Sequence, residues 1–358
     1  MTPRGTDWTL ALLVAFLFAT GIMSLFGGAQ SSAWVFAAHG IAGGALGLLV
    51  GWKMRRVWRR LADPARWDGR TVAGLLVTSF VAAALGSGFV WASGGDLRVA
   101  GYGLLNWHMV LGTALAVTVL VHALARAKPI RRRDLAHRRQ FLEAVVIGVG
   151  AFAVWRLQRP VARLFGWSGA ERRFTGSYEA ASFEGNAFPA TSWVADAPRL
   201  LDPAGFRLAI GGLVATPVEL SLAEVARAGG SAPHEVEATL DCTGGFYSTQ
   251  RWRGVRLDRV LERARPDAGA THVRVISHTG YRWSFPLSEA DSLLLASHVG
   301  EEPLSHEHGA PLRLVAPGRR GFQWVKWVVG LELSDAPDPG ALASTVWSSF
   351  TPEGRGAA

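Results

Sequence analysis

The sequence contains a single cysteine, Cys242, whose surroundings make it a candidate metal ligand. Alternating apolar residues from Val236 to Leu240 predict a β-strand, and Thr243, Gly244 and Gly245 follow the cysteine. Glycines at the end of a strand let the backbone approach a bound group closely. A lone cysteine is more often a small buried apolar side chain, so the assignment depends on what else the chain carries.

Two motifs downstream supply that context. The first is His306-Glu-His308-Gly-Ala-Pro-Leu-Arg313, and the second is Val325-Lys326-Trp327. Together with Cys242 they resemble the molybdopterin-binding domain of the sulfite oxidase family, over residues 174 to 334. In that family the cysteine thiolate ligates molybdenum beside the two sulfurs of one pterin dithiolene. The resemblance therefore implies that Cys242 is the molybdenum ligand and that His308, Arg313 and Lys326 bind the pterin and its phosphate.

The resemblance extends to residues 183 to 193, which look like the family's first pterin-contacting loop and add Asn186 and Phe188 as cofactor-binding candidates. The chemistry fits, because a soft, anionic thiolate suits a high-valent metal and fixed positive charges suit a phosphate. The implied activity is oxygen-atom transfer, either S- or N-oxide reduction or sulfite-type oxidation. Sulfite-oxidising members carry arginines directly after the cysteine, whereas here Arg251 and Arg253 lie further on. The sequence therefore does not predict an anion pocket of that kind.

The first part of the chain has the composition of a membrane domain. Residues 8 to 157 are dominated by Ala, Leu, Val, Gly and Trp and contain five apolar segments. A helix needs about 20 residues to cross a bilayer, and each segment is close to this length, although the fifth is short. We expect a retained first span, since no cleavage site for a signal peptide stands out. The expected spans are Trp8 to Phe26, Trp34 to Trp52, Thr71 to Trp91, Trp107 to Ala125 and Phe141 to Trp155.

The net charge of +9 is explained by topology. Seven Lys or Arg lie in the loop 53 to 70 and seven more in 126 to 139, and the positive-inside rule places both loops in the cytoplasm. No nucleic-acid recognition module accompanies the charge, so we expect no nucleic-acid partner. Residues after the fifth span are then extracytoplasmic, which predicts a multi-pass protein of the inner membrane with a periplasmic or extracytoplasmic catalytic domain.

A run that resembles an export signal precedes the fifth span. The run His137-Arg138-Arg139-Gln140-Phe141-Leu142 resembles the twin-arginine motif. Simple anchoring by positive charge explains the arginines but not the Phe-Leu that follows them. In the resembling family the molybdenum cofactor is assembled in the cytoplasm, so export of a folded domain would suit this chain.

Three histidines lie inside the apolar segments, where ionisable side chains usually have a function. His39 is in the second segment, and His108 and His122 are in the fourth. Because these two segments run in the same direction, His39 and His108 lie at similar depth and can bind one haem iron from opposite sides. This arrangement resembles the four-helix b-type cytochromes. The alternative for each histidine is a hydrogen bond to a neighbouring helix.

In that cytochrome pattern a second haem uses residues fourteen positions further along each helix, which here are Lys53 and His122. A lysine at position 53 leaves a second haem in doubt, although His122 remains a candidate ligand. Small residues after His39 and His108 would let a flat macrocycle approach the helices, and they also serve plain helix packing. These residues are Gly40, Ala42, Gly43, Gly44, Gly47 and Gly112.

The sequence thus predicts a multi-domain protein: a transmembrane b-type cytochrome-like helical domain (1–157), a linker (158–182), an α+β molybdopterin-binding oxidoreductase domain (183–334) and a tail (335–358). Within the α+β domain, strands are expected at 206–210, 236–240, 272–276, 283–286, 312–316 and 325–333, and helices at 222–228, 257–264 and 288–296.

These features lead to two hypotheses. The first is a membrane-anchored molybdenum oxidoreductase that exchanges electrons with haem b, and its partners are a small-molecule substrate, membrane lipid, and the quinone pool or a redox partner protein. The second is a membrane electron-transfer cytochrome whose other domain is a non-catalytic binding module. The molybdenum content of the purified protein separates them.

Overall fold

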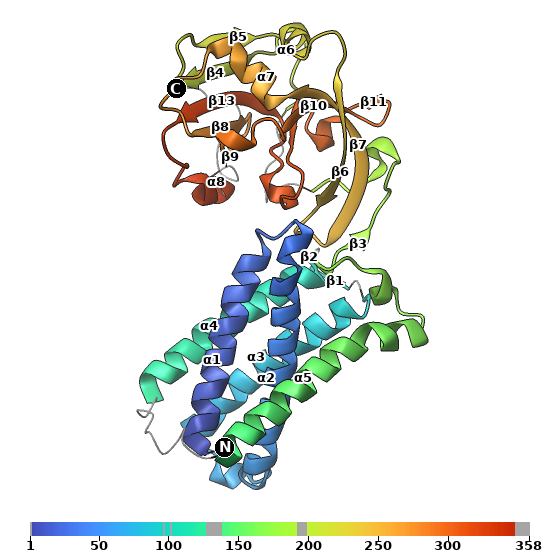
Figure 1. The fold of residues 1–358 in the computed structure, drawn as a ribbon. Coiled ribbons are helices and arrows are strands. Elements are labelled where there is room, and N and C mark those ends of the chain that lie inside the picture. Colours follow the sequence, from blue (N-terminus) through green and yellow to red (C-terminus); the bar gives the residue numbers. More distant parts are fainter. Residues whose placement is uncertain (1, 96, 101, 127–137, 192–198, 348–358) are drawn as a thin grey trace. The chain divides into compact units, whose positions relative to one another are not determined.

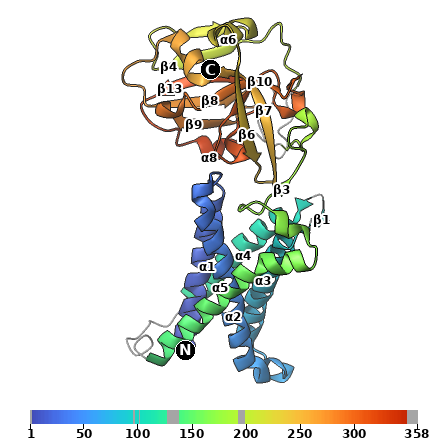
Figure 2. The same cartoon turned by 45° about the vertical axis from the view of Figure 1, so that its right-hand side comes forward.

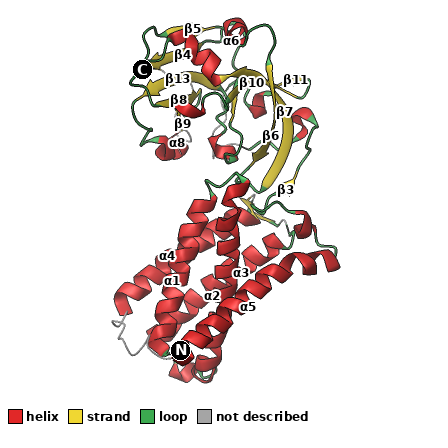
Figure 3. Ribbon diagram, in the orientation of Figure 1, coloured by secondary structure: helices red, strands yellow, loops and turns green. Residues whose placement is uncertain are grey.

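The computed structural model describes residues 2–95, 97–100, 102–126, 138–191 and 199–347. The chain forms two compact units, Met1–Tyr178 and Glu179–Ala358. We call the first the helical unit and the second the α+β unit, and Figure 3 shows the difference in their secondary structure. A short strand, β3 (Tyr178–Glu179), spans the junction between them.

Five long helices build the helical unit (Figures 1 and 2). Each contains a stretch long and apolar enough to cross a membrane, which confirms the five expected helices. Helix α1 packs on α2 and α4, α3 packs on α4, and α2 packs on α5. A small two-stranded sheet, β1 (Arg98–Val99) and β2 (Tyr102–Gly103), precedes α4. The helices are α1 (Pro3–Ser24), α2 (Ala33–Leu61), α3 (Gly69–Ala92), α4 (Leu104–Arg126) and α5 (Arg138–Leu164).

The interior of this unit is a narrow apolar seam. Most large apolar side chains point outward instead, such as Leu124 at 81% exposure and Val146 at 70%. An outward apolar surface is what a lipid environment requires, because lipid tails provide no hydrophobic force between helices and close packing holds them together. The buried seam consists of Val14, Leu46, Val81, Ala84 and Leu115.

Helix α5 extends beyond the apolar segment that ends at Trp155 in the sequence. It continues to Leu164 with Pro160 inside it, and the chain then folds back onto the end of α3, where the N–H of Gly169 donates to the carbonyl of Ser93 at 3.3 Å. The residues from 158 to Tyr178, which the sequence assigns to a linker, thus belong to the helical unit.

Two sheets form the α+β unit. In the first, β7 (Phe246–Arg256) pairs antiparallel with β6 (His234–Asp241) and with β10 (Leu294–Val299), and β10 also pairs with β11 (Glu302–Pro303) and β12 (Arg313–Val315). The second has the order β5 (Val218–Leu220), β4 (Leu208–Gly212), β13 (Val328–Ser334), β8 (His272–Ser277) and β9 (Arg282–Pro286). Three short helices accompany them: α6 (Leu222–Ala228), α7 (Leu257–Leu261) and α8 (Ala341–Trp347).

The expected α+β class is confirmed, and one expected element is wrong. The predicted helix at 288–296 is a short 3₁₀ turn, Leu287–Glu289, followed by strand β10. Residues 293 to 296 are buried at every position because β10 lies between β7 and β12. A short apolar run without alternation fits a central strand as well as a helix, and only the neighbouring strands decide between them.

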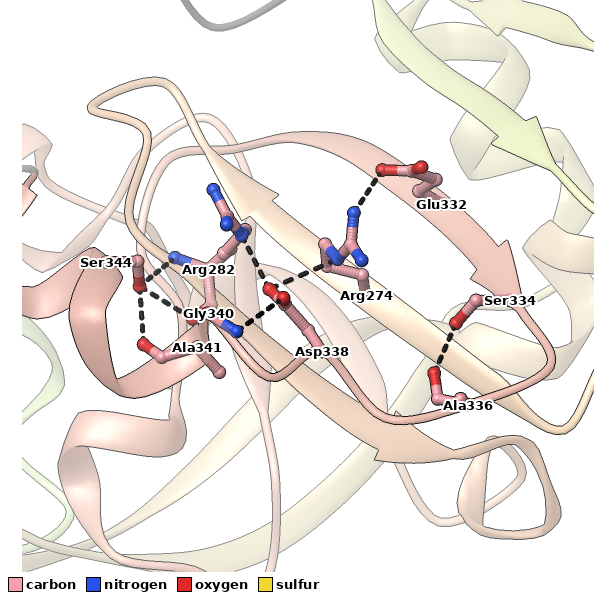
Figure 4. A network of polar contacts seen from close by, with 9 residues as sticks. All are labelled: Arg274, Arg282, Glu332, Ser334, Ala336, Asp338, Gly340, Ala341 and Ser344. Carbon is pink, nitrogen blue, oxygen red and sulfur yellow. Dashed lines mark hydrogen bonds and ion pairs between the residues drawn. The ribbon is translucent and has the colours of Figure 1, made fainter.

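A polar network holds the segment containing α8 on the second sheet (Figure 4). The buried carboxylate of Asp338 accepts a hydrogen bond from Arg282 and lies 3.2 Å from Nε of Arg274. Ser344 donates to the carbonyl of Arg282 at 3.1 Å and fixes α8 against β9. Burial alone would raise the pKa of Asp338, but the Arg282 hydrogen bond and the two guanidinium charges hold it below its ordinary value. The structure therefore includes residues 335–347, which the sequence assigns to a tail, in the α+β unit.

Candidate functional site

Cys242 lies in the loop of the β6–β7 hairpin and is 8% exposed. Its N–H donates to the carbonyl of Phe246 at 2.8 Å, which closes the loop. Its sulfur accepts a hydrogen bond from the N–H of Gly244 at 3.3 Å and lies 3.2 Å from Oγ1 of Thr191. The hairpin thus fixes the thiol in place and surrounds it with small polar groups.

The segment after β12 supports this loop from another direction. Arg320 forms a buried ion pair with Asp241 at 2.6 Å and donates to the carbonyl of Cys242 at 3.3 Å. A Cβ atom on Gly321 would lie 3.0 Å from Cα of Cys242, so only glycine fits there without displacement. Arg320 and Thr191 were not singled out as site residues in the sequence.

Arg313 supplies a buried positive charge in the same region. It is 2% exposed, and its guanidinium donates to the carbonyl of His308 at 3.1 Å and lies 5.4 Å from the ring centre of Trp252. Burial lowers the pKa of Arg313 to about 10, and the nearby Cys242 sulfur opposes this. Its Nε has no hydrogen-bond partner within the described residues. A buried cation of this kind is stabilised by a neighbouring anion.

Both ring nitrogens of His308 form hydrogen bonds within the protein. Its Nε2–H donates to the carbonyl of Phe188 at 2.9 Å, so Nδ1 accepts from the hydroxyl of Ser305 at 2.7 Å. The rings of Phe188 and His308 pack with centroids 4.0 Å apart, and both residues are buried. These two predicted cofactor-binding residues therefore lie together, and their side chains are engaged with each other.

Asn186 is also engaged within the protein. Its amide donates to the carboxylate of Glu302 at 3.1 Å and to the carbonyl of Pro303 at 2.9 Å, and its oxygen accepts from the N–H of Ser305. Since Ser305 also binds His308, Asn186 helps hold the turn that carries this histidine.

Lys326 connects this turn to the cysteine. Its ammonium donates to the carbonyl of Glu307 at 2.6 Å and to the carbonyl of Thr191 at 2.8 Å, and Thr191 is the residue whose hydroxyl lies beside the Cys242 sulfur. The structure thus places Lys326 next to the residue that contacts the thiol, while Arg313 provides the buried cation.

The residues present fit a metal cofactor that brings most of its own ligands. Within the described ranges, no group of three or more His, Cys, Asp or Glu side chains can hold a metal ion. A metal at Cys242 would therefore take its other ligands from a bound group. A pterin dithiolene offers soft sulfur donors and an anionic phosphate, which match the thiol and the buried Arg313.

Comparison with known proteins decides the family. A family model described as the oxidoreductase molybdopterin binding domain matches residues 194–342. The uncharacterized oxidoreductase YuiH of Bacillus subtilis (strain 168) is 30% identical over 148 residues, which cover 40% of this chain and 73% of that protein. The chain belongs to the molybdopterin-binding oxidoreductase family.

Two further relatives in this family have named activities. The protein-methionine-sulfoxide reductase catalytic subunit MsrP of Gluconobacter oxydans (strain 621H) is 30% identical over 191 residues, covering 48% of this chain and 57% of that protein. The mitochondrial sulfite oxidase of Rattus norvegicus is 32% identical over 160 residues, covering 36% and 29%. The chain thus spans 57% of the first of these two relatives and 29% of the second. Family membership makes it an oxidoreductase with a molybdenum cofactor.

The helical unit contains a second group of interest, which the family model does not cover. Nδ1 of His39 lies 2.9 Å from Oγ1 of Thr20, and the hydroxyl of Thr20 donates its proton to the carbonyl of Phe16 at 2.8 Å. Thr20 can therefore only accept from His39, so the proton of this imidazole is on Nδ1. That leaves the lone pair of Nε2 for another partner.

His108 has the same tautomer for a similar reason. Its Nδ1 lies 3.0 Å from the carbonyl of Ala84 and 3.2 Å from Oγ of Ser87, and a carbonyl only accepts. The rings of His39 and His108 have centroids 6.2 Å apart and an interplanar angle of 77°. A Cβ atom on Gly88 would lie 2.9 Å from the His108 ring. Thr20, Ser87 and Gly88 were not predicted, because hydroxyls and glycines in apolar spans usually serve helix packing.

The small residues near His39 lie at contacts between helices, which is the packing role that the sequence left open as an alternative. A Cβ on Gly40 would lie 2.9 Å from the Trp155 ring, and Gly44 lies against the backbone of Ala151. These glycines therefore let α5 pack closely on α2. No atom lies within 4 Å of a Cβ built on Gly112 among the described residues.

The position that pairs with His122 is occupied by an ion pair. The ammonium of Lys53 on α2 lies 2.8 Å from the carboxylate of Asp7 on α1. A charged lysine engaged with an acid has no lone pair for a metal. The structure therefore places two candidate haem ligands together near one end of the helices, His39 and His108, but does not place His122 with a second imidazole at position 53.

The close approach at Gly321 gives a first prediction. Gly321→Ala should lower the molybdenum content of the purified protein by about fivefold or more, since an overpacked position typically costs about 1–3 kcal/mol. Gly211→Ala in β4 is the matched control, because no atom lies within 4 Å of its added Cβ. Metal analysis of both full-length variants checks this, and equal molybdenum contents would contradict the supporting role of Gly321.

The neutral state of His308 gives a second prediction. Burial lowers the pKa of His308 to about 4, the Phe188 carbonyl partly opposes this, and the charges of Arg313 and Lys326 lower it further. Its contribution to stability is therefore complete above pH 6.5 and is lost as the pH falls from 6.5 towards 4, by up to about 3 kcal/mol. Chemical unfolding of the wild type and of His308→Gln at several pH values checks this. The difference in unfolding free energy between the two should shrink in that window, and a constant difference would refute it.

Proposed function

We propose that the protein is a membrane-anchored molybdenum oxidoreductase that transfers an oxygen atom from or to a small-molecule substrate and exchanges electrons with a b-type haem. In this proposal Cys242 ligates the molybdenum, and His39 and His108 ligate the haem iron. The observation that carries the electron-transfer part is the imidazole pair of His39 and His108. The matched family model describes only the molybdopterin binding domain, so it does not supply this part of the proposal.

The geometry of that pair supports one iron between the two rings. Two imidazoles on opposite sides of one metal ion need centroids about 6 Å apart, because a metal–nitrogen bond is about 2 Å and each nitrogen lies about 1 Å from its ring centre. The observed separation is 6.2 Å. Within the described residues neither Nε2 has a hydrogen-bond partner, whereas both Nδ1 atoms have one. A hydrogen bond on the other ring nitrogen is the usual way in which proteins orient a ligand histidine.

In the α+β unit, each proposed site residue has a distinct task. The molybdenum cofactor, when bound, supplies two-electron oxygen-atom transfer. Cys242 presents its thiolate from a loop fixed by Gly244 and Phe246, and Arg313 and Lys326 balance the negative charge of the pterin phosphate. His308 and Asn186 hold the turn between them, so we assign them as positioning residues.

The proposed electron route uses the covalent connection between the units. The first residues of the α+β unit run along β7: the N–H of Ala180 donates to the carbonyl of Tyr247, and that of Phe183 to the carbonyl of Thr249, each at 2.9 Å. Tyr247 lies opposite Asp241, the residue before Cys242. The polypeptide therefore leaves the helical unit and joins the hairpin that carries the thiol, which favours electron exchange within one chain.

We propose a neutral oxide, such as a sulfoxide, as the substrate. Arg253 pairs with Glu301, and Arg251 lies opposite Glu237, about 13 Å along the strand from Asp241. Arg320 is already neutralised by Asp241. These arginines therefore do not offer the free charge that a dianion such as sulfite needs. A sulfoxide takes up two electrons and two protons and yields a thioether and water, and quinol is the proposed source of both.

The proposed membrane topology rests on charge. The basic loops before α3 and before α5 belong to the cytoplasmic side, which places the α+β unit on the extracytoplasmic side. Residues 127–137, including His137, lie outside the described residues. Phe141 and Leu142 of the proposed twin-arginine motif lie in the first turns of α5.

Substitution of the proposed molybdenum ligand tests the catalytic half. Cys242→Ala should abolish sulfoxide reduction while the reduced-minus-oxidised haem spectrum stays unchanged, because the two sites are in separate units. A screen of sulfoxides, N-oxides and sulfite that follows haem oxidation on mixing identifies the substrate and the direction. Full activity in Cys242→Ala would refute the assignment, and haem reduction by sulfite would refute the neutral-oxide proposal.

Substitution of the imidazoles tests the electron-transfer half. His39→Ala and His108→Ala should each remove the haem spectrum while activity with a soluble artificial electron donor remains. His122→Ala is the matched control, since His122 lies on the same helix as His108 but fourteen residues, or about 21 Å of helix rise, further along. An unchanged spectrum in His108→Ala would show that the ligands lie elsewhere.

A further inference from the structure

A tight turn formed by residues 172–178 closes one end of the helical unit. The guanidinium of Arg172 stacks on the Trp91 ring at 3.9 Å and is 7% exposed. The N–H of Gly176 donates to the carbonyl of Arg173 at 2.9 Å, and a Cβ on Gly176 would lie 3.2 Å from the indole nitrogen of Trp91. Arg173 reaches the loop between α1 and α2, where it donates to the carbonyl of Gly28 at 3.3 Å.

This turn lies at the end of the helices that carries the two histidines. Trp91 is four residues after Ser87, one helical turn from the residue that holds His108. Phe36 is three residues before His39, and its ring packs edge-on against Phe174 with centroids 5.5 Å apart. Both contacts are thus about one turn, or about 5.4 Å of helix rise, beyond the imidazoles.

The turn also concentrates positive charge at this place. Arg159 on α5 donates to the carbonyl of Arg172 at 3.1 Å, and Arg172 donates to the carbonyl of Gly176 at 2.9 Å. Arginines Arg172 and Arg173 are consecutive and are both held by contacts to helix ends and loops. A buried or half-buried guanidinium is the side chain best suited to bind a carboxylate, because its planar fork matches the two oxygens.

We infer that Arg172 and Arg173 bind the two carboxylates on one edge of the haem. This inference rests on the proposed ligation of haem by His39 and His108. A haem between these rings must direct its charged edge away from the apolar seam, because ionised groups are costly inside the membrane. The turn at 172–178 carries two cations and contacts both helices about one turn from the imidazoles.

The test removes the carboxylates instead of the protein residues. Full-length protein freed of haem is titrated in detergent with haem and with haem dimethyl ester, which keeps the iron and the macrocycle but carries no carboxylate. Absorption at the haem band reports binding. We expect the wild type to bind haem about tenfold to a hundredfold more tightly than the ester, the range that one or two charge-assisted hydrogen bonds give.

Variants then assign that preference to the two arginines. In a protein with Arg172→Gln and Arg173→Gln the two compounds should bind equally, whereas Arg163→Gln, an exposed arginine in the last turn of α5, should keep the preference. Equal binding to the wild type would overturn the inference while the haem ligation stands, and so would a preference that survives in the double variant. Failure of the wild type to bind either compound would overturn the haem proposal itself. If the double variant does not fold, the single variants Arg172→Gln and Arg173→Gln replace it, and an undiminished preference in both would overturn the inference.

Discussion

The α+β unit buries the positive charge of Arg313. Arg313 is 2% exposed, and no carboxylate among the described residues pairs with it. Arg320, which is similarly buried, is neutralised by Asp241 at 2.6 Å. An uncompensated buried charge costs several kcal/mol, so a bound anion would stabilise Arg313 in this state. The anionic cofactor of the molybdopterin-binding family meets this need, and we expect cofactor binding to contribute directly to the stability of the unit.

The helical unit also contains partly buried polar groups that the protein satisfies only in part, but these groups are neutral. The protein satisfies one nitrogen of each imidazole, through Thr20 for His39 and through Ala84 and Ser87 for His108. These partners fix the tautomer, which would reduce the entropy lost on binding the proposed haem. The close contact at Gly88 shows how little space the helix packing leaves around the His108 ring. In both units the protein therefore holds the candidate ligand side chains in place by its own contacts. One atom of each remains available for the proposed cofactor.

Sequence patterns correctly predicted the helices and strands whose signal lies within a single element. Apolar length gave the five helices, and alternation gave strands such as β6 and β8, because these signals lie within one element. The strand β10 was taken for a helix, since its burial on both faces comes from β7 and β12. The motifs identified Cys242, Arg313 and Lys326, but not Thr191 or Arg320. These two contact the cysteine loop from segments 51 and 79 residues away, and such contacts leave no local pattern.

Because both proposed redox centres lie on one polypeptide, the protein surface does not have to guide two separate proteins together. Separate redox partners must find each other by diffusion, and complementary surface charges usually guide them. A short covalent connection instead gives an effective concentration in the millimolar range. Residues 180 to 183 anchor that connection to β7, the strand paired with β6, which ends one residue before Cys242. With both proposed centres on one polypeptide, electron exchange would not require two separate proteins to find each other by diffusion.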